Sequence, residues 1–356
     1  MVDDVNFPPR GRGAVGNPGN RYAEHQRESF DDGWAREDEA VPVLHTVLGI
    51  DKSRTAITYN DSPDVPFDRS INPYRGCEHG CVYCFARPSH AYLDLSPGLD
   101  FESRLFHKPD LAVQLRAELA RPGYRCAPVG VGVNTDAYQP VERRLKLTRA
   151  VIEVLAEHRH PFSLITTSAL VERDLDLLAP LAARRLVSVA VSVTTLDRTL
   201  SRRLEPRAAA PERRLETIRR LTGAGIPVTV LVAPLIPFLN DAELEAILAA
   251  VREAGAVECA YILLRLPHEL KTLFRDWLEM HVPLKAERIM QRLRDCRGGH
   301  DNDSRFGVRM RGEGLFAELI SRRFHLARRR LGFPGAPGLD VSQFRVPGRP
   351  VQLDLI

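Results

Sequence analysis

The sequence VSVAVSV at residues 187–193 decides the fold class. Side chains alternate between the two faces of a β-strand, so the valines share one face, and Ser188, Ala190 and Ser192 share the other. Valines in this arrangement pack against a layer of helices, whereas the small and partly polar face has room for a ligand. The pattern predicts a strand of a barrel that helices surround, and a strand of an open, doubly wound sheet is the alternative.

Short β-rich segments and amphipathic helical stretches alternate on both sides of this strand. The expected strands are residues 70–74, 129–134, 162–166, 187–193, 228–233 and 260–264. A helix is expected over residues 142–158, where Leu145 and Ile152 recur at helical spacing, and another over residues 211–223. Strands that alternate with helices pair in parallel through right-handed crossovers, so the fold class is α/β.

Three regions are expected in the chain of 356 residues. Residues 1–45 contain GRGAVGNPGN and then a mixed-charge stretch without a helical or strand period, which predicts an extended or partly disordered arm. Residues 46–270 contain the repeat of strands and helices. Residues 271–356 lose the strand rhythm and predict a helical C-terminal extension and tail, with helices over residues 284–296 and 313–330.

The charge of the chain is nearly balanced, with 50 basic and 46 acidic residues and a net charge of +4. Such a balance creates no field strong enough to imply a nucleic-acid partner. Arginines do gather near the C-terminus, where a solvated helix end explains them and contact with nucleic acid is the alternative. They are Arg322, Arg323, Arg328, Arg329 and Arg330.

Hydropathy and cysteine usage favour a cytoplasmic protein. No apolar run approaches the roughly 18 residues of a membrane span, and the first ten residues lack a secretory signal, so no membrane partner is expected. In a reducing compartment the six cysteines do not predict disulfides. Cys126, Cys259 and Cys296 are scattered and predict small buried side chains, whereas the other three crowd together and predict a metal site.

The crowded cysteines are Cys77, Cys81 and Cys84, in a loop directly after the first expected strand. Three thiolates so close together repel one another unless a soft metal neutralises them. They can bind three irons of a 4Fe-4S cluster and leave the fourth iron without a protein ligand. The spacing Cys-x3-Cys-x2-Cys therefore predicts an iron-sulfur centre with an open position for another molecule.

Two other classes of protein are compatible with a cysteine loop. A ferredoxin-type electron carrier would supply a fourth cysteine nearby, whereas the next one here is Cys126. Structural zinc with His79 or His90 as the fourth ligand would make the chain a zinc-stabilised nucleic-acid binding module without catalysis. Structural zinc sites usually combine ligands from two separated knuckles, and here all three thiols come from one loop.

The pattern Cys-x3-Cys-x-aromatic-Cys after a first strand resembles the signature of the radical S-adenosylmethionine superfamily. Within that superfamily, four stretches are similar to the branch related to spore photoproduct lyase, many of whose members have no assigned substrate. They are SPDVPFDRSINPYRGCEHGCVYCFARPSHAY (residues 62–92), NTDAYQPVE (134–142), LEPRAAAPERRLETI (204–218) and APLIPFLND (233–241). The resemblance extends from about residue 45 to beyond residue 320.

The resemblance implies a partial (β/α)6, TIM-like barrel and a lyase-like enzyme. It implies a 4Fe-4S cluster whose open iron binds the amino and carboxylate groups of S-adenosyl-L-methionine. An external one-electron donor such as flavodoxin or ferredoxin then drives cleavage to a 5′-deoxyadenosyl radical, which abstracts hydrogen from a substrate in the barrel. The substrate is unassigned, and nucleic acid is among the candidates.

The resemblance also implies roles for individual residues beyond the cluster ligands. Tyr83 matches the aromatic position whose backbone meets the adenine. Thr135 and Asp136 match a position after the second strand that contacts the methionine part of the cofactor, with turn capping as the alternative. Ser192 matches a hydroxyl of the fourth strand near the cofactor, and the alternation of VSVAVSV places it on the interior face as well.

The sequence also departs from the related lyases. Thr167 stands where they carry a lysine that pairs with the cofactor carboxylate, so Arg173 or another base compensates or the affinity is lower. Val133 stands where they carry the cysteine that returns hydrogen to the product radical. Phe85 replaces the second of two tyrosines that flank the third cluster cysteine.

Several residues near the strand ends are candidates for the substrate face, because parallel barrels place their sites on the loops that follow the strands. Asp136, Tyr138 and Arg265 are the main candidates. Other charged residues near strand ends are Glu142, Glu205, Arg207 and Asp241. Helix capping is the simpler account of Asp241, and Glu205 and Arg207 flank a proline and can pair with each other.

Overall fold

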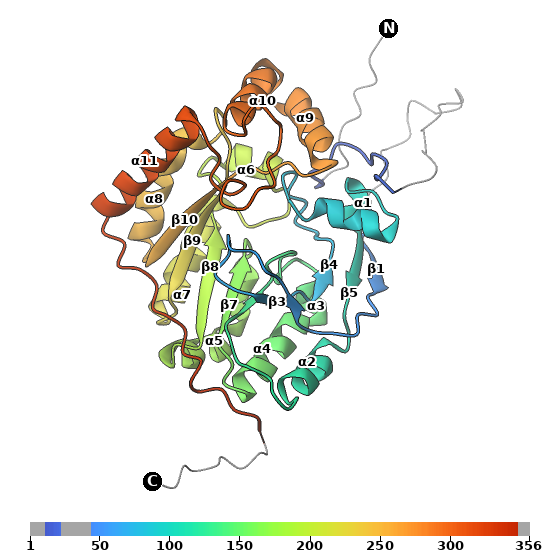
Figure 1. The fold of residues 1–356 in the computed structure, drawn as a ribbon, viewed down its shortest axis with the longest axis vertical. Helices are drawn as coiled ribbons and strands as arrows, with labels where there is room; N and C mark the ends of the chain where they lie inside the picture. The colour runs from blue at the N-terminus through green and yellow to red at the C-terminus, as the bar shows by residue number, and fades with distance from the viewer. Residues whose placement is uncertain (1–10, 23–43, 348–356) are drawn as a thin grey trace.

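The computed structural model describes residues 11–22 and 44–347, and every structural statement below refers to these residues. Most of the arm expected over residues 1–45, and the last residues of the expected tail, lie outside them. Figure 1 shows a sheet in the middle of the molecule with helices along its outer side. Within the described ranges no helix is both long enough and apolar enough to cross a membrane.

The larger sheet contains seven strands in the order β10-β9-β8-β7-β6-β3-β2. All neighbouring pairs from β3 to β10 are parallel, and only β2 runs antiparallel to β3. The strands are β2 (Thr58–Tyr59), β3 (Arg69–Ile71), β6 (Val129–Val131), β7 (Phe162–Thr166), β8 (Val187–Ser192), β9 (Val228–Leu235) and β10 (Glu258–Leu263).

The parallel strands stand in the same order in the sheet as in the sequence. A doubly wound sheet reverses its strand order at a switch point, so that alternative does not describe this chain. A second, smaller sheet lies beside the cysteine loop. It pairs β5 (Arg104–His107) in parallel with β1 (Val47–Ile50) and antiparallel with β4 (Tyr74–Arg75).

The expected α/β class is confirmed, and each of the six expected strands has a counterpart; the strand over residues 162–166 keeps its predicted bounds and the other five have shifted ends. β6 ends three residues early because Gly132 adopts φ +75, and a Cβ there would lie 2.9 Å from the Ile165 carbonyl oxygen. The first expected strand divides, since β3 ends at Ile71 and residues 74–75 pair with β5 instead. The helix expected over residues 142–158 divides at Lys146, whose φ is 53.

Helices connect the parallel strands, and most of them pack on one face of the sheet (Figure 1). They include α2 (Leu111–Leu119), α3 (Glu142–Leu145), α4 (Leu147–Glu157), α5 (Leu175–Ala183), α6 (Arg198–Leu204), α7 (Pro211–Gly223) and α8 (Leu244–Glu253). Short 3-10 helices are η1 (Arg87–Leu93), η2 (Ala169–Asp174), η3 (Asp241–Glu243) and η4 (Pro283–Lys285). α1 (Leu99–Ser103) precedes β5 and lies against the cysteine loop.

The described part of residues 271–347 contains helices together with long irregular segments. It holds most of α9 (Leu270–His281), α10 (Ala286–Asp295) and α11 (Leu315–Arg330). α11 lies along α8 (Figure 1), and its Arg323 pairs with Glu245 at 2.6 Å. Arg328 pairs with Glu258 of β10 at 2.8 Å. Arg323 and Arg328, two arginines of the basic C-terminal group, therefore join α11 to α8 and to β10 through ion pairs.

The two faces of β8 differ as the alternation predicts. Val187, Val189 and Val191 are buried in the core beneath the helices. Ser188 and Ser192 are only half-buried on the opposite face, where the hydroxyl of Ser188 lies 3.1 Å from that of Ser163 on β7. The face away from the helices is therefore small, partly polar and partly accessible.

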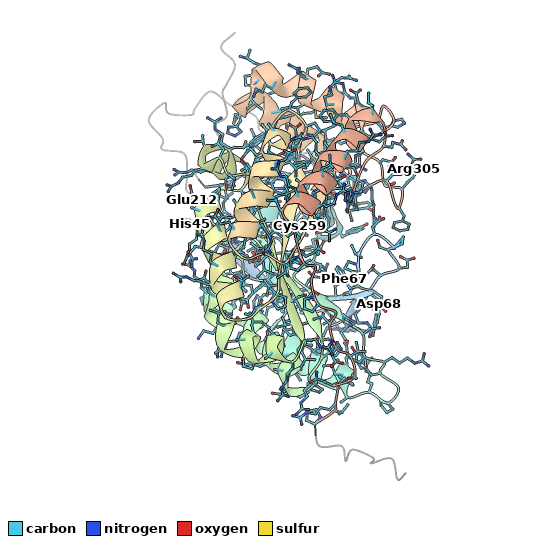
Figure 2. The ribbon with its side chains drawn as sticks, turned by 90° about the vertical axis from the view of Figure 1, so that its left-hand side faces the viewer. His45, Phe67, Asp68, Glu212, Cys259 and Arg305 are labelled. Atoms are coloured by element: carbon cyan, nitrogen blue, oxygen red, sulfur yellow. The ribbon has the colours of Figure 1, made fainter. Side chains whose placement is uncertain are left out.

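Segments next to the two edge strands contact each other across this inner face. Asp64, in the loop between β2 and β3, accepts a hydrogen bond from the Gly307 amide at 2.7 Å and pairs with Arg309. The following residue, Met310, accepts a hydrogen bond from the Leu263 amide at the end of β10. Phe67, Asp68 and Arg305 lie toward one side of the molecule in Figure 2. A continuous set of contacts thus leads from one edge strand to the other.

Candidate cofactor site

The cysteine loop begins directly after β4, and two glycines shape it. Gly76 and Gly80 adopt φ values of +75 and +68, which residues with side chains rarely adopt. A Cβ at Gly76 would lie 2.8 Å from the Phe101 carbonyl oxygen, and one at Gly80 would lie 2.7 Å from Oε2 of Glu102. The amide of Cys84 donates to the carbonyl of Cys81 at 3.2 Å, so the loop turns back on itself between the cysteines.

The three cysteine side chains lie close enough to influence one another. Burial raises the pKa of the Cys84 thiol to about 11, and the nearby Cys77 adds to this shift. Burial also raises the pKa of Cys81 well above its usual value, with further contributions from Glu205 and the other two thiols. Uncharged thiols are thus favoured until a metal stabilises the thiolates, which is the behaviour expected of cluster ligands. In a cube each thiolate binds a different iron, so the sulfur atoms need not converge on one point.

Both candidate zinc-ligand histidines contact protein groups, and His79 also interacts with the Cys77 thiol. His90 is buried, its Nε2 lies 2.9 Å from the Arg104 carbonyl oxygen, and burial lowers its pKa to about 4. His79 Nδ1 lies 3.0 Å from the hydroxyl of Thr167 and 3.3 Å from Oδ2 of Asp136. In the described chain no three His, Cys, Asp or Glu side chains surround a single metal position. The donor set fits a cluster bound by three cysteines.

Asp136 joins the cysteine loop to the ends of β6 and β7. Its carboxylate accepts hydrogen bonds from the Tyr138 amide at 2.8 Å, the Thr166 hydroxyl at 2.7 Å and the Thr167 amide at 2.7 Å. Burial would raise its pKa, but His79 and these hydrogen bonds hold the pKa at about 2. Burial likewise opposes the charge of His79, but Asp136 and, to a lesser extent, Cys77 outweigh burial and raise the pKa of His79 to about 10. The pair therefore fixes the loop against the sheet.

Thr135 and Thr167 stand beside this pair. The Thr135 hydroxyl is buried and donates to the Tyr74 carbonyl oxygen at 2.7 Å, which ties the end of β6 to β4. The Thr167 hydroxyl donates to Asp136 at 3.0 Å. Arg173 pairs with Glu142 at 2.8 Å and with Asp174 at 2.7 Å, so its charge is already compensated. Any contact of Thr135 with the cofactor stays a prediction.

Tyr83 is anchored to a buried ion pair behind the loop. Its hydroxyl donates to Glu205, which also accepts from the Thr194 hydroxyl at 2.6 Å. Arg214 pairs with the same carboxylate and donates to the Ser192 carbonyl oxygen at 2.9 Å. These contacts fix the ring of Tyr83 and the end of β8 relative to each other.

The pairing that the sequence suggested for Glu205 is wrong. Glu205 pairs with Arg214, one helical segment further along the chain, while Arg207 pairs with Glu78 at 3.3 Å. The backbone of this segment also holds the loop, because the Val82 amide donates to the Leu204 carbonyl at 3.0 Å. Residues 204–207 thus form one wall of the site.

The described part of the arm, residues 11–22, also packs against the cysteine loop. The amides of Gly13 and Ala14 donate to the carboxylate of Glu102 at 2.9 and 2.8 Å. A Cβ at Gly13 would lie 1.8 Å from the Gly80 carbonyl oxygen, so the arm backbone touches the cysteine loop directly. The arm is therefore part of the site, a role that its composition did not predict.

Glu102 links the arm to the loop through Arg87. Both side chains are fully buried and form an ion pair. The Arg87 guanidinium also donates to the carbonyl oxygens of Gly80 at 3.1 Å and of Cys81 at 2.8 Å. Sequence reasoning missed this pair, although an arginine three residues after the last cysteine was visible.

The substrate-face candidates occupy different environments. Tyr138 is fully buried, and its hydroxyl donates to Asp174 at 2.8 Å, among the helices. Arg265 follows β10, and its guanidinium lies 5.4 Å from the ring centre of Phe85, the residue after Cys84. Of the three candidates, Asp136 and Arg265 lie beside the cysteine loop, and Tyr138 supports the structure behind it.

The faces of β8 give a test of which side binds the cofactor. The Ser192 hydroxyl makes no side-chain hydrogen bond within the described residues and is half-buried on the inner face. Ser192→Val is expected to keep the fold and weaken S-adenosylmethionine binding. Val191→Ser places an unpaired hydroxyl beneath the helices and is expected to cost about 1–3 kcal/mol of stability. Melting and cofactor-binding measurements on both variants check this, and identical effects would contradict the assignment of faces.

Comparison with known proteins agrees with the class that the fold and the cysteine loop define, an α/β enzyme with an iron-sulfur site. The model of the radical SAM superfamily matches residues 71–251. The chain belongs to the radical SAM superfamily, whose members use a 4Fe-4S cluster and S-adenosylmethionine.

The proteins found to be similar in sequence are named as uncharacterised proteins. Proteins of Mycobacterium tuberculosis and Mycobacterium bovis are 39% identical over 229 residues, which cover 64% of this chain and 67% of theirs. A protein of Methanocaldococcus jannaschii is 27% identical over 173 residues, covering 49% of this chain and 62% of its own.

Solved structures of spore photoproduct lyase share the fold. A variant of that enzyme has a TM-score of 0.54 at 15% identity and covers 87% of this chain and 88% of its own. The lyase complexed with dinucleoside spore photoproduct has a TM-score of 0.54 at 14% identity, over 81% of this chain and 80% of its own. At these identities the likeness concerns the fold alone.

Proposed function

We propose that this chain is a radical S-adenosylmethionine enzyme in which Cys77, Cys81 and Cys84 hold a 4Fe-4S cluster. The observation that carries the proposal is the construction of the cysteine loop, which three separate parts of the chain hold at the carboxyl edge of the parallel sheet. When bound, the cluster supplies one electron that cleaves S-adenosylmethionine to a 5′-deoxyadenosyl radical, which abstracts hydrogen from the substrate.

The sheet is proposed to form a partial (β/α)6 barrel around the substrate. Its parallel strands follow the chain order, helices cover one face, and segments beside both edges contact each other through Asp64 and Arg309. The inner face carries small residues such as Ser188 and Ser192, which leave room for a ligand. This enclosure would limit access of water to the reacting atoms.

The residues around the loop are proposed to position the cofactor. Tyr83 presents its backbone to the adenine, and the hydrogen bond of its hydroxyl to Glu205 keeps that backbone in place. Ser192 offers a free hydroxyl at the end of β8. Thr135 and Asp136 shape the turn after β6, and the Asp136–His79 pair holds the loop against it.

The electron donor is proposed to be an external protein such as flavodoxin or ferredoxin, in a cytoplasmic setting. The substrate class is open at this level, and nucleic acid is among the candidates because spore photoproduct lyase shares the fold. The expected domains remain residues 1–45, 46–270 and 271–356, with the qualification that residues 11–22 belong to the cofactor site.

Anaerobic reconstitution with iron and sulfide tests the proposal. Reduced, reconstituted protein is expected to be brown and to convert S-adenosylmethionine to 5′-deoxyadenosine. A zinc-stabilised nucleic-acid binding module would hold zinc instead and bind DNA without iron. An electron carrier would cycle between redox states without consuming S-adenosylmethionine, and that result would contradict the proposal.

The protein is expected not to repair spore photoproduct. Val133 and Phe85 stand where the lyases carry the cysteine and the second tyrosine of the hydrogen relay, and a C–H bond of valine is a far poorer hydrogen donor than a thiol. Cys126 precedes β6 and lies at the amino end of the parallel strands, whereas the cluster loop lies at their carboxyl end. Cys126 is therefore badly placed to act as the hydrogen donor in place of the missing cysteine.

The assay incubates reduced, reconstituted protein with the dinucleoside spore photoproduct. Cleavage of S-adenosylmethionine without recovery of thymines is the expected result. Efficient catalytic repair would show the prediction to be wrong, and loss of that repair in Cys126→Ala would identify the donor.

A further inference from the structure

No described carboxylate forms a salt bridge with Arg265, which lies near the cluster loop. It follows β10, at the same edge of the sheet as the loop. Its guanidinium lies over the ring of Phe85, and Phe85 directly follows Cys84. One aromatic residue therefore separates this cation from a proposed cluster ligand.

The donors of Arg265 are largely unused within the described residues. Its Nη1 lies 3.8 Å from the sulfur of Met310, which is a weak acceptor. Its Nε is buried and has no hydrogen-bond partner there. A guanidinium carries five N–H donors, and leaving them without acceptors in a partly buried site is costly.

The charged groups around Arg265 do not neutralise its positive charge. Arg309 and Arg297 both act on it, and the acidic neighbour that opposes them is Asp64. The Asp64 carboxylate is already shared between Arg309 and the Gly307 amide. Burial, together with the two arginines, lowers the pKa of Arg265 to about 10, so the side chain stays charged at neutral pH. A partly buried cation of this kind lacks a counter-charge.

The surroundings of Arg265 are held in place without any ligand. The Arg297 guanidinium donates to the carbonyl oxygens of Leu264 at 2.9 Å, Val308 at 3.1 Å and Arg309 at 2.9 Å. The Leu263 amide donates to the Met310 carbonyl at 2.9 Å. These bonds fix the end of β10 to the segment that carries Arg309 and Met310, so the site is organised before anything binds.

Phe85 adds an apolar surface to this site. Its side chain is 46% exposed, which is unusual for a large aromatic residue next to a buried loop. The cation–π contact between Arg265 and Phe85 is weak at an exposed position and does not offset the unused donors of Arg265.

We propose that Arg265 binds an oxyanion of the substrate, a phosphate or a carboxylate, while Phe85 contacts a flat apolar part of the same molecule. The inference rests on the proposed function, because it concerns the substrate that is to meet the radical. A guanidinium pairs with two oxygens of such a group at once, and this pairing supplies both the missing acceptors and the missing counter-charge. Arg265 is thus a specificity-determining residue that selects anionic substrates.

Small probes test the site directly. Phenyl phosphate and benzoate each carry a ring and an oxyanion, and phenol carries the ring alone. Binding to anaerobically reconstituted protein is measured by titration calorimetry at low salt. Both anions are expected to bind better than phenol, and their ratio shows whether phosphate or carboxylate is preferred. Arg265→Gln is expected to weaken anion binding about tenfold or more, and Arg265→Lys less. Phe85→Leu is expected to weaken phenyl phosphate and phenol alike.

Arg322→Gln is the matched control, because Arg322 lies on the exposed surface of α11 and is expected to leave every probe unaffected. The melting temperature of each variant shows whether it folds. Equal binding of phenol and the anions, or anion binding that survives Arg265→Gln in a folded protein, would overturn the proposal. So would an equal loss of S-adenosylmethionine binding in Arg265→Gln, since Arg265 would then hold the cofactor. Failure to make 5′-deoxyadenosine contradicts only the proposed function, as the probes need no turnover.

Discussion

Replacement of Cys77, Cys81 or Cys84 by alanine is expected to abolish cluster assembly and all cleavage of S-adenosylmethionine. Each thiolate binds a different iron, and the nearest cysteine in the sequence, Cys126, lies at the other end of β6. Iron and sulfide content and the visible spectrum after reconstitution measure the effect.

Cys126→Ala is the matched control, because it removes a thiol that is only half-buried and leaves the loop untouched. It is expected to retain full iron content. A motif variant with native iron, sulfide and spectrum would end the assignment of these cysteines as ligands.

Gly13→Ala is expected to separate the arm from the cluster loop, although Gly13 is far from the cysteines in the sequence. The added methyl carbon would lie 1.8 Å from the Gly80 carbonyl oxygen, which is backbone and has little freedom to move. If the arm leaves the loop, the buried Glu102 carboxylate loses the two hydrogen bonds that the Gly13 and Ala14 amides donate. Each group left unsatisfied lowers the stability of the fold by about 1–3 kcal/mol. The variant should melt at a lower temperature and lose iron faster during anaerobic gel filtration.

Gly19→Ala provides the comparison for this prediction, since it makes the same change in the same arm where a Cβ would meet nothing within 4 Å. It is expected to behave like the unaltered protein. If both variants melt alike and retain iron equally, the arm is not needed to hold the loop.

The strands and their two faces could be predicted because their signals are local. VSVAVSV shows its alternation within seven residues, and the structure buries the valines and half-exposes the serines as predicted. The strand ends were less predictable. The end of β6 depends on how closely Gly132 approaches the Ile165 carbonyl, which is a contact between strands that the local sequence does not reveal.

The cysteine loop was predictable from its spacing, whereas the walls around it were not. The pair formed by Arg87 and Glu102, and its contacts with the arm at Gly13, join residues up to 89 positions apart. Glu205 was expected to pair with its neighbour Arg207 because the two are close in sequence. The chain turns between them, and Arg214 reaches the buried carboxylate instead.

The walls of the cysteine loop are made at very different times during protein synthesis. Gly13 leaves the ribosome before the cysteines, but Glu205, which anchors Tyr83, follows that residue by 122 positions. When all three cysteines have been synthesised, the nascent chain still lacks Leu204, Glu205 and Arg214. Contacts between positions so far apart in the sequence form late in folding. Delivery of iron and sulfide is therefore expected to succeed on the completed chain and not during its synthesis, because the thiols have no fixed geometry until the later segment has folded against them.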